Sequence, residues 1–375
     1  MVVAVSLVAA SCSGSTASQS SARSSKSSGA SADVSATSSD AAEGDLEADL
    51  TAAAEGLVGD DDGGGSFLIH RDDKTTAVAV GARNSDGDPI TGDTEFHMAS
   101  ISKIFVATMV MQLVDEGTVD LDSPIKDYLP DLAIDGDPTV RQVLGHRSGF
   151  VEHLNPSFLA MVSEDPSKNY SPDEVLATVA GVPAGEPGGD FEYANTNYIV
   201  LGLLIETLTG DTIDEALQAR VAEPLGLTHT RFTVGDSTYA DDTAAPWTSL
   251  GELAGEPDFE YTALRSASWA AGSLVSTPGD LQQFLTALMA SELTSESALE
   301  QMKPKPGEPY GLGIESGDYL LGLEGRPFMG HTGGAPGYVS LMVIEPETGT
   351  VLAMVRNNGK TSGNDSDLDP FIELL

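Results

Sequence analysis

Two segments with the patterns of antiparallel hairpins lie far apart in the chain, and this separation constrains the fold more than any other feature. Residues 67–69 and 76–80 are apolar or β-branched and flank a polar turn. Residues 338–344 and 350–356 form a second such pair around a Pro- and Gly-containing turn. Between the two, from about 115 to 265, the pattern is helix and loop. We therefore predict an α+β fold: an antiparallel sheet built from both ends of the chain and flanked by helices, with an inserted, mostly helical lobe.

Two helices are predicted in more detail. Residues 101–113 (ISKIFVATMVMQL) place apolar side chains all round a helix, so we expect this helix to be buried. Thr277 is a favourable N-cap and Pro278 fits the first helical position, so another helix is expected to begin there.

The chain is strongly acidic. It has 58 Asp and Glu residues against 18 Lys and Arg residues, which gives a formal net charge of -40. A field of this sign repels phosphate backbones and anionic lipid surfaces, so we expect no nucleic-acid partner and regard the charge as an aid to solubility. Six scattered histidines and one cysteine form no recognisable metal set, so we expect neither a metal nor another cofactor.

The N-terminal residues have the composition of an export signal. Residues 1–11 begin with an apolar run that is about half of the ~20 residues needed to span a bilayer, and small residues follow it. Cys12 then follows the tripeptide Ala-Ala-Ser, an arrangement similar to the lipobox of bacterial lipoproteins. We predict a signal peptide over 1–11 and lipid attachment at Cys12, which would tether an exported protein to the cell envelope. Ordinary secretion is the alternative.

The next segment is predicted to be a flexible tether. Residues 12–44 are dominated by Ser, Ala, Gly and Thr and cannot bury enough apolar surface to offset the entropy of ordering. The folded domain is predicted over 45–375, with the helical lobe at about 115–265, and we expect it to be a monomer.

A serine and a lysine three residues apart occur twice, and one pair has a setting suited to catalysis. Ser100 and Lys103 lie at the start of the predicted buried helix, where residues i and i+3 share a face. A helix N-terminus can help to stabilise an oxyanion, and burial favours the neutral amine that Lys103 needs to accept a proton. Ser123 and Lys126 enclose Pro124 in a stretch without helical periodicity, which predicts a loop.

Two further segments offer groups that could complete a site. Tyr193 and Asn195 follow a Gly- and Pro-rich loop; a phenol can shuttle protons, and an amide can bind both an ammonium and a substrate carbonyl. Residues 331–334 (HTGG) lie at the edge of the predicted sheet, where small residues let a substrate backbone approach and the histidine adds a polar or cationic group. Taken singly, each segment is explained as well by packing or by a turn.

Together the three motifs resemble those of a known family. SISK at 100–103, YAN at 193–195 and HTG at 331–333 are similar, in order and separation, to the active-site motifs of the penicillin-recognising serine hydrolases. That family includes class C β-lactamases, serine D-Ala-D-Ala carboxypeptidases and related esterases. The resemblance covers about 65–360. The histidine in HTG is more similar to the carboxypeptidase and esterase branches than to class C enzymes, which usually carry K-T-G.

The resemblance implies a role for each residue. Ser100 would be the nucleophile of a covalent acyl-enzyme, and Lys103 and Tyr193 would handle its protons; which of the two is the formal base stays open. Asn195 would position the substrate amide and Lys103. The substrate-binding wall would comprise His331, Thr332, Gly333 and Gly334, with the N–H groups of Ser100 and Gly334 as the oxyanion hole. Trp269 would line the pocket, and His146 would be a structural turn residue.

The resemblance also implies a small acyl or peptide substrate of the D-Ala-D-Ala type. A D-Ala-D-Ala carboxypeptidase of the cell envelope is the leading expectation. An esterase or β-lactamase of the same fold, and a sensor that binds penicillin or muropeptides, are the alternatives. Some carboxypeptidases hold the substrate carboxylate with a basic residue just after Y-G-L-G. Here Ile314 and Glu315 follow that segment, so Arg326 or His331 would have to supply the cation.

Overall fold

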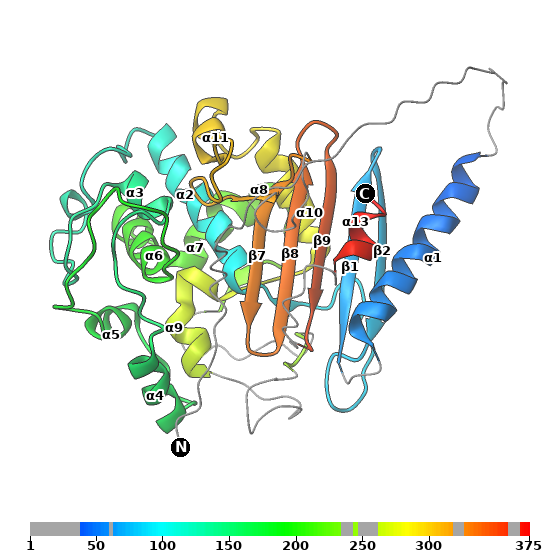
Figure 1. Ribbon diagram of the computed structural model, residues 1–375, viewed down its shortest axis with the longest axis horizontal. Helices are drawn as coiled ribbons and strands as arrows, with labels where there is room; N and C mark the ends of the chain where they lie inside the picture. Colours follow the sequence, from blue (N-terminus) through cyan, green and yellow to red (C-terminus); the bar gives the residue numbers. More distant parts are fainter. Residues whose placement is uncertain (1–37, 60–62, 234–242, 247–261, 318–325, 359–367) are drawn as a thin grey trace, which may run out of the picture.

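The computed structural model describes residues 38–59, 63–233, 243–246, 262–317, 326–358 and 368–375. Its centre is a six-stranded antiparallel sheet to which both ends of the described chain contribute, as predicted (Figure 1). In spatial order its strands are β2 (Lys74–Gly81), β1 (Gly64–Arg71), β9 (Thr350–Arg356), β8 (Tyr338–Glu345), β7 (Met329–Ala335) and β6 (Glu315–Ser316).

Both predicted hairpins are confirmed. Strands β1 and β2 pair from Gly64 with Gly81 to Arg71 with Lys74, and the two turn residues between them, Asp72 and Asp73, both have positive φ. Two successive residues with positive φ give the turn twist that matches two antiparallel strands. Strands β8 and β9 form the second hairpin.

Strand β9 shows how the sheet is covered on both faces. Val351, Ala353 and Val355 belong to one buried cluster, whereas Leu352 and Met354 belong to another. Successive side chains of a strand point to opposite faces, so an uninterrupted apolar strand must be buried from both sides.

Helices supply the two covers. On one face, α1 (Ser38–Val58) packs on β2 and β1, and α13 (Asp369–Ile372) lies beside it (Figure 1). On the other face, α10 (Pro278–Met289) packs on β9, β8 and β1. The side chain of Thr277 caps α10 by accepting from the Asp280 amide, as predicted. The sheet is therefore the middle of three layers.

The helix α2 (Ser102–Asp115) lies between the sheet and the lobe. Eleven of its residues are buried, on all of its sides, as the apolar pattern predicts. It packs against α6 (Thr196–Thr209), α9 (Thr262–Gly272) and α11 (Glu296–Met302). A buried helix of this kind can present the residues at its N-terminus with little freedom to move.

The segment between β3 and β5 is mostly helical. Its remaining helices are α3 (Val140–Leu144), α4 (Pro156–Glu164), α5 (Pro172–Ala177), α7 (Ile213–Leu217) and α8 (Glu223–Leu225). A small second sheet places β5 (Leu274–Ser276) between β3 (Phe96–His97) and β4 (Arg231–Phe232).

One predicted boundary differs from the structure. The tether was predicted to continue to 44, but α1 already begins at Ser38. Ala and Glu become frequent from Ala41 onwards, and both favour a helix over an unfolded chain. The predicted signal peptide, Cys12 and the rest of the tether lie outside the described residues. Within the described part, no helix is both long and apolar enough to cross a membrane.

Candidate active site

Ser100 lies in a short 3₁₀ turn, Ala99–Ile101, immediately before α2. Ala99 has a φ of +47°, in the left-handed region that non-glycine residues rarely adopt. Ser102 holds this turn, because its hydroxyl donates to the Ala99 carbonyl at 2.7 Å and accepts from the Leu274 amide at 3.0 Å. Such strained residues, held by their surroundings, cluster at functional sites.

The amine of Lys103 contacts three acceptors. Its Nζ lies 2.9 Å from Ser100 Oγ, 2.8 Å from Asn195 Oδ1 and 2.7 Å from the carbonyl oxygen of Ala271. Two of these acceptors are carbonyl oxygens, which can only receive hydrogen bonds. A neutral amine has two hydrogens and one lone pair. When both hydrogens go to the carbonyl oxygens, the lone pair is directed at the Ser100 hydroxyl.

Burial makes this neutral form accessible. Lys103 is fully buried, and burial is the main reason that its pKa falls to about 7. The negative charges of Glu152 and Glu315 oppose this effect and raise the pKa. The two acids therefore keep the amine close to the point at which it exchanges a proton near neutral pH.

Tyr193 lies beside both Ser100 and Lys103, whose Nζ is 5.0 Å from the centre of its ring. Its hydroxyl shares a hydrogen bond with Ser100. Burial, followed by the charge of Glu315, raises its pKa well above 10. The phenol is therefore protonated at neutral pH. It is suited to relay or donate a proton, whereas Lys103 has the pKa of a base.

The ring of His146 packs against the ring of Tyr193. The two rings stack with centroids 4.3 Å apart, and His146 Nδ1 accepts from the Ala194 amide and from Asn197 Nδ2. His146 itself has a φ of +54°. Burial lowers its pKa well below 6.5, so the ring is neutral. These contacts fit the structural role expected of His146. They indicate that this role is to orient Tyr193.

Asn195 is held by an acid that the sequence analysis missed. Glu152 Oε2 accepts from the Asn195 backbone amide at 2.5 Å and from its Nδ2 at 3.2 Å. Because Nδ2 points at the carboxylate, Oδ1 points at Lys103. Glu152 lies two residues after Phe150 and six after His146, and a lone acid there was the available signal.

Gly333 and Gly334 have different surroundings. A Cβ built at Gly333 would lie 2.2 Å from the Met98 carbonyl oxygen, whereas one at Gly334 would meet nothing within 4 Å. Gly333 therefore lets β7 pass directly against the segment that leads to Ser100. Gly334 is exposed and leaves open space for a substrate.

His331 differs from its predicted role as a cationic pocket residue. It is fully buried, and burial lowers its pKa to about 3. Its Nε2 lies 3.1 Å from the Tyr310 hydroxyl and its Nδ1 lies 2.6 Å from the Thr332 carbonyl oxygen. The ring is therefore neutral, and both nitrogens are bonded inside the protein. The sequence motif alone could not show that His331 is buried beside Tyr310, and this burial is why the ring is neutral.

Glu315 is the second acid missed by the sequence analysis. It lies in the edge strand β6, is 6% exposed, and accepts from the Thr332 amide at 2.7 Å and from Thr332 Oγ1 at 2.9 Å. Burial raises its pKa to about 7. From the sequence, Glu315 was noted only because it is not basic. The structure places it in contact with Thr332 of the site.

Two further residues have surroundings that the motifs did not show. Trp269 is buried and its ring packs on Gly202 of α6, so its expected place in the pocket wall stays a prediction. Arg326 does not supply a cation to the site. Its guanidinium stacks on Phe328 and its Nη1 lies 3.4 Å from the Ile372 carbonyl oxygen, at α13 on the other face of the sheet.

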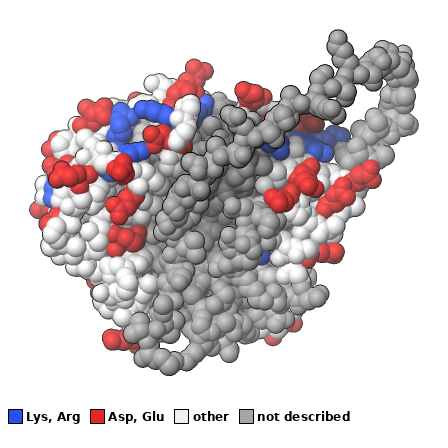
Figure 2. All heavy atoms as spheres, viewed as in Figure 1, with Lys and Arg blue, Asp and Glu red and all other residues white. Residues whose placement is uncertain are grey.

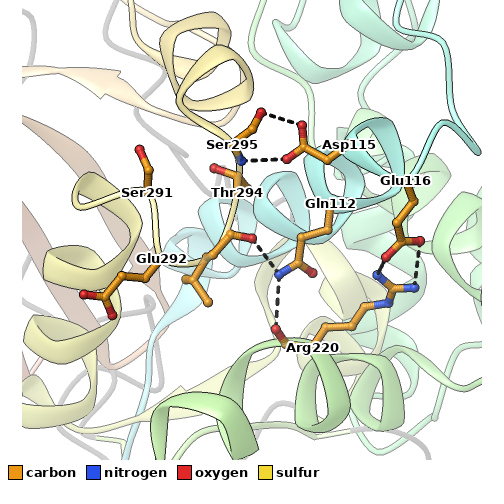
Figure 3. Close-up of a pocket in the computed structure, with 9 residues that line it drawn as sticks. Gln112, Asp115, Glu116, Arg220, Ser291, Glu292, Thr294 and Ser295 are labelled. Atoms are coloured by element: carbon orange, nitrogen blue, oxygen red, sulfur yellow. Dashed lines mark hydrogen bonds and ion pairs between the residues drawn. The ribbon is translucent and has the colours of Figure 1, made fainter.

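The second Ser-Lys pair and a hollow at the far end of α2 lie apart from this site. Ser123 lies in a loop before the turn Ile125–Asp127, as predicted. A hollow of about 670 Å³ lies at the opposite end of α2 from Ser100 (Figure 3). Its side chains bind one another: Asp115 accepts from Ser295, and Arg220 pairs with Glu116.

The electrostatic surroundings agree with the composition. Acidic side chains are spread over the described surface on the face seen in Figure 2. Among the residues that the structure describes, no group of three His, Cys, Asp or Glu side chains could hold a metal ion.

Comparison with known proteins places this geometry in a family. The beta-lactamase family profile matches residues 52–375. Penicillin-binding protein 4 of Amycolatopsis lactamdurans is 27% identical over 342 residues, which cover 83% of this chain and 84% of the relative. The chain covers 53% to 60% of the length of the next three curated relatives that it matches.

Solved structures of D-specific enzymes are also similar. D-amino acid amidase from Ochrobactrum anthropi SV3 superposes with a TM-score of 0.74 at 28% identity, over 88% of this chain and 97% of the amidase. D-stereospecific amidohydrolase from Streptomyces sp. gives a TM-score of 0.73 at 27% identity, over 87% and 97% of the two chains. The match of the family profile over nearly the whole described chain shows that this protein belongs to the beta-lactamase family of serine hydrolases.

Proposed function

We propose that the protein hydrolyses the amide bond on the carbonyl side of a D-amino acid residue, through an acyl-enzyme on Ser100. The observation that carries this proposal is the contact of Lys103 Nζ with Ser100 Oγ, made while its other two contacts are carbonyl oxygens. D-specificity is supported by the similarity to a D-amino acid amidase and a D-stereospecific amidohydrolase.

Acylation would proceed as follows. Ser100 Oγ attacks the substrate carbonyl carbon while its proton passes to the neutral Lys103 amine. When the C–N bond breaks, the leaving nitrogen takes a proton from Tyr193, which is resupplied from Lys103. The products of this half-reaction are a free amine or ammonia and an ester on Ser100.

Deacylation would reverse these transfers with water as the nucleophile. A water molecule loses its proton to the same Tyr193 and Lys103 pair as its oxygen attacks the ester carbonyl. The C–O bond to Ser100 then breaks, Ser100 regains a proton, and a carboxylic acid leaves. One proton path thus serves both halves of the cycle.

The leaving group distinguishes two forms of this function. Release of D-alanine from a peptide ending in D-Ala-D-Ala would make the protein the D-Ala-D-Ala carboxypeptidase predicted from the sequence. Release of ammonia or an amine would make it an amidase. The sequence relationship to a penicillin-binding protein supports the former, and the two solved structures support the latter.

The site of action is part of the proposal. The signal-like residues 1–11 and Cys12 support export and attachment to the cell envelope, where peptides containing D-alanine occur. An esterase or β-lactamase of the same fold would use the same Ser100 chemistry. A penicillin or muropeptide sensor would have no need of an activated nucleophile.

A pair of anilides tests the proposal. D-alanine p-nitroanilide and L-alanine p-nitroanilide differ only in configuration, and hydrolysis of each is followed by the colour of nitroaniline. We expect turnover of the D form to be clearly faster and to vanish in Ser100→Ala. Equal turnover of both forms would contradict D-specificity. Hydrolysis of p-nitrophenyl acetate without either anilide would favour the esterase, and rapid hydrolysis of a fluorescent penicillin the β-lactamase.

A further inference from the structure

Glu315 binds Thr332, a residue that the family resemblance implies is part of the substrate-binding wall. It lies in β6, directly across from Gly330 of β7, and its side chain extends along β7 to Thr332. Thr332 belongs to the HTG segment that the family resemblance assigns to the carboxylate side of the pocket. The protein therefore places a carboxylate of its own on that residue.

The hydrogens of Thr332 are committed to this contact. A threonine offers one hydroxyl hydrogen and one amide hydrogen. The hydroxyl and amide of Thr332 lie 2.9 Å and 2.7 Å from the same oxygen, Glu315 Oε2. Thr332 as a whole residue is partly exposed. Toward a substrate, that hydroxyl presents lone pairs and can accept from an N–H group. A carboxylate has no hydrogen to give it.

His331, Arg326 and Lys103 do not provide a free positive charge that could stabilise a substrate carboxylate beside Glu315. His331 is neutral, with both nitrogens bonded to Tyr310 and to the Thr332 carbonyl. Arg326 lies at α13. The Lys103 amine is engaged with Ser100, Asn195 and Ala271. Burial raises the pKa of Glu315 to about 7, so above that pH a substrate carboxylate beside Thr332 would meet a like charge.

We propose that Glu315 and Thr332 form a specificity element that rejects a free carboxylate after the scissile bond and accepts an uncharged amide there. The inference rests on the proposed function and narrows its substrate class to D-amino acid amides and to peptides whose residue after the cleaved bond ends in an amide. Glu315 acts on substrate choice, and Ser100, Lys103 and Tyr193 remain the groups that touch the reacting atoms.

Two peptides with the same scissile bond test this element. N-acetyl-D-Ala-D-Ala and its C-terminal amide differ only in the terminal group. Cleavage releases D-alanine from the acid and D-alanine amide from the amide, and both products are quantified by mass spectrometry. We expect kcat/KM of the wild-type protein to be higher for the amide by on the order of 10-fold or more, because juxtaposed like charges suppress the wrong partner.

Glu315→Gln keeps the shape of the side chain and removes its charge. We expect the amide-to-acid ratio of kcat/KM to fall by about 10- to 100-fold, mainly through a gain on the acid. The matched control is Glu345→Gln, which makes the same change at the end of β8, where Glu345 accepts from Thr348 at 2.7 Å. The control should keep the wild-type ratio.

The outcomes are separable. A wild-type protein that prefers the acid, or a Glu315→Gln ratio equal to that of the control, would overturn the proposal. The wild-type comparison decides even if Glu315→Gln does not fold. Loss of turnover on both peptides with ester hydrolysis retained would overturn the proposed function itself, and this inference with it.

Discussion

Lys103 Nζ lies 2.9 Å from Ser100 Oγ, and the carbonyl oxygens of Asn195 and Ala271 are its other two partners. Because carbonyl oxygens cannot donate, this arrangement directs the lone pair of a neutral lysine at the serine hydroxyl. The pKa of Lys103, lowered by burial to about 7, makes that neutral form abundant at neutral pH, whereas the pKa of Tyr193 is raised well above 10. The geometry therefore assigns the base to Lys103, a choice that the sequence left open.

Loss of either proton-handling group should slow chemistry more than binding. General acid–base assistance typically contributes ~10²–10⁴-fold, so Lys103→Ala and Tyr193→Phe should each lower kcat/KM by that order. The double variant should lose little more than the worse single variant, because residues on one proton path act as a unit. Steady-state kinetics of the three variants measure this. Additive losses would mean that the two groups act independently.

The pH dependence should report the Lys103 amine. The amine accepts a proton only when neutral, which is above its pKa of about 7. We therefore expect kcat/KM to be low in acid and to rise with pH through a midpoint near 7, since this profile follows groups of the free enzyme. A pH–rate profile on a neutral ester, whose own charge does not change, measures the midpoint.

A charge change beside Lys103 should move that midpoint in a known direction. Glu152 raises the pKa of Lys103, so Glu152→Gln should lower it and shift the profile toward acid. Glu308→Gln is the matched control, because Glu308 pairs with Arg147 and is part-exposed. An unchanged midpoint in Glu152→Gln would show that its charge does not act on the catalytic base.

The same substitution should destabilise the protein at one of two neighbouring glycines and have little effect at the other. Gly333→Ala places a methyl group 2.2 Å from the Met98 carbonyl oxygen, so β7 or the segment before Ser100 must shift. Overpacking of this kind typically costs ~1–3 kcal/mol, and we expect the free energy of unfolding to fall by about that amount. Gly334→Ala meets nothing within 4 Å and should be nearly neutral in stability. Urea denaturation compares the two; equal losses would refute the close approach of β7.

Local patterns predicted the fold well, and the structure brings the predicted residues Ser100, Lys103 and Asn195 into contact. The two hairpins, the buried α2 and the Thr277 cap each follow from residues close together in the chain. Ser100 and Lys103 share one helical turn, so their contact was also a local inference. These features need no knowledge of how distant segments meet.

The parts that escaped prediction depend on distant segments. Glu315 meets Thr332 only because β6 pairs with β7, and Glu152 meets Asn195 only because the loop after α3 returns to the start of α6. His331 was expected to be a pocket cation, but its burial beside Tyr310 makes it neutral. A short sequence motif predicts neither which strands pair nor how deeply a side chain is buried.

The proposed attachment to the envelope depends on Cys12, which lies outside the described residues. If Cys12 is lipidated, the protein should partition into detergent from whole cells, and Cys12→Ser should move it to the soluble fraction. Phase separation followed by immunoblotting measures both forms. Equal partitioning would leave simple secretion as the explanation of the signal-like N-terminus.

The central claim is that Ser100 carries the acyl group. The most direct measurement is intact-mass and peptide-mapping spectrometry after reaction with a penicillin or an activated ester. We expect one adduct, on the peptide that contains Ser100, its loss in Ser100→Ala, and its retention in Ser123→Ala, which alters the second Ser-Lys pair. An adduct on any other residue, or one that persists in Ser100→Ala, would contradict the account.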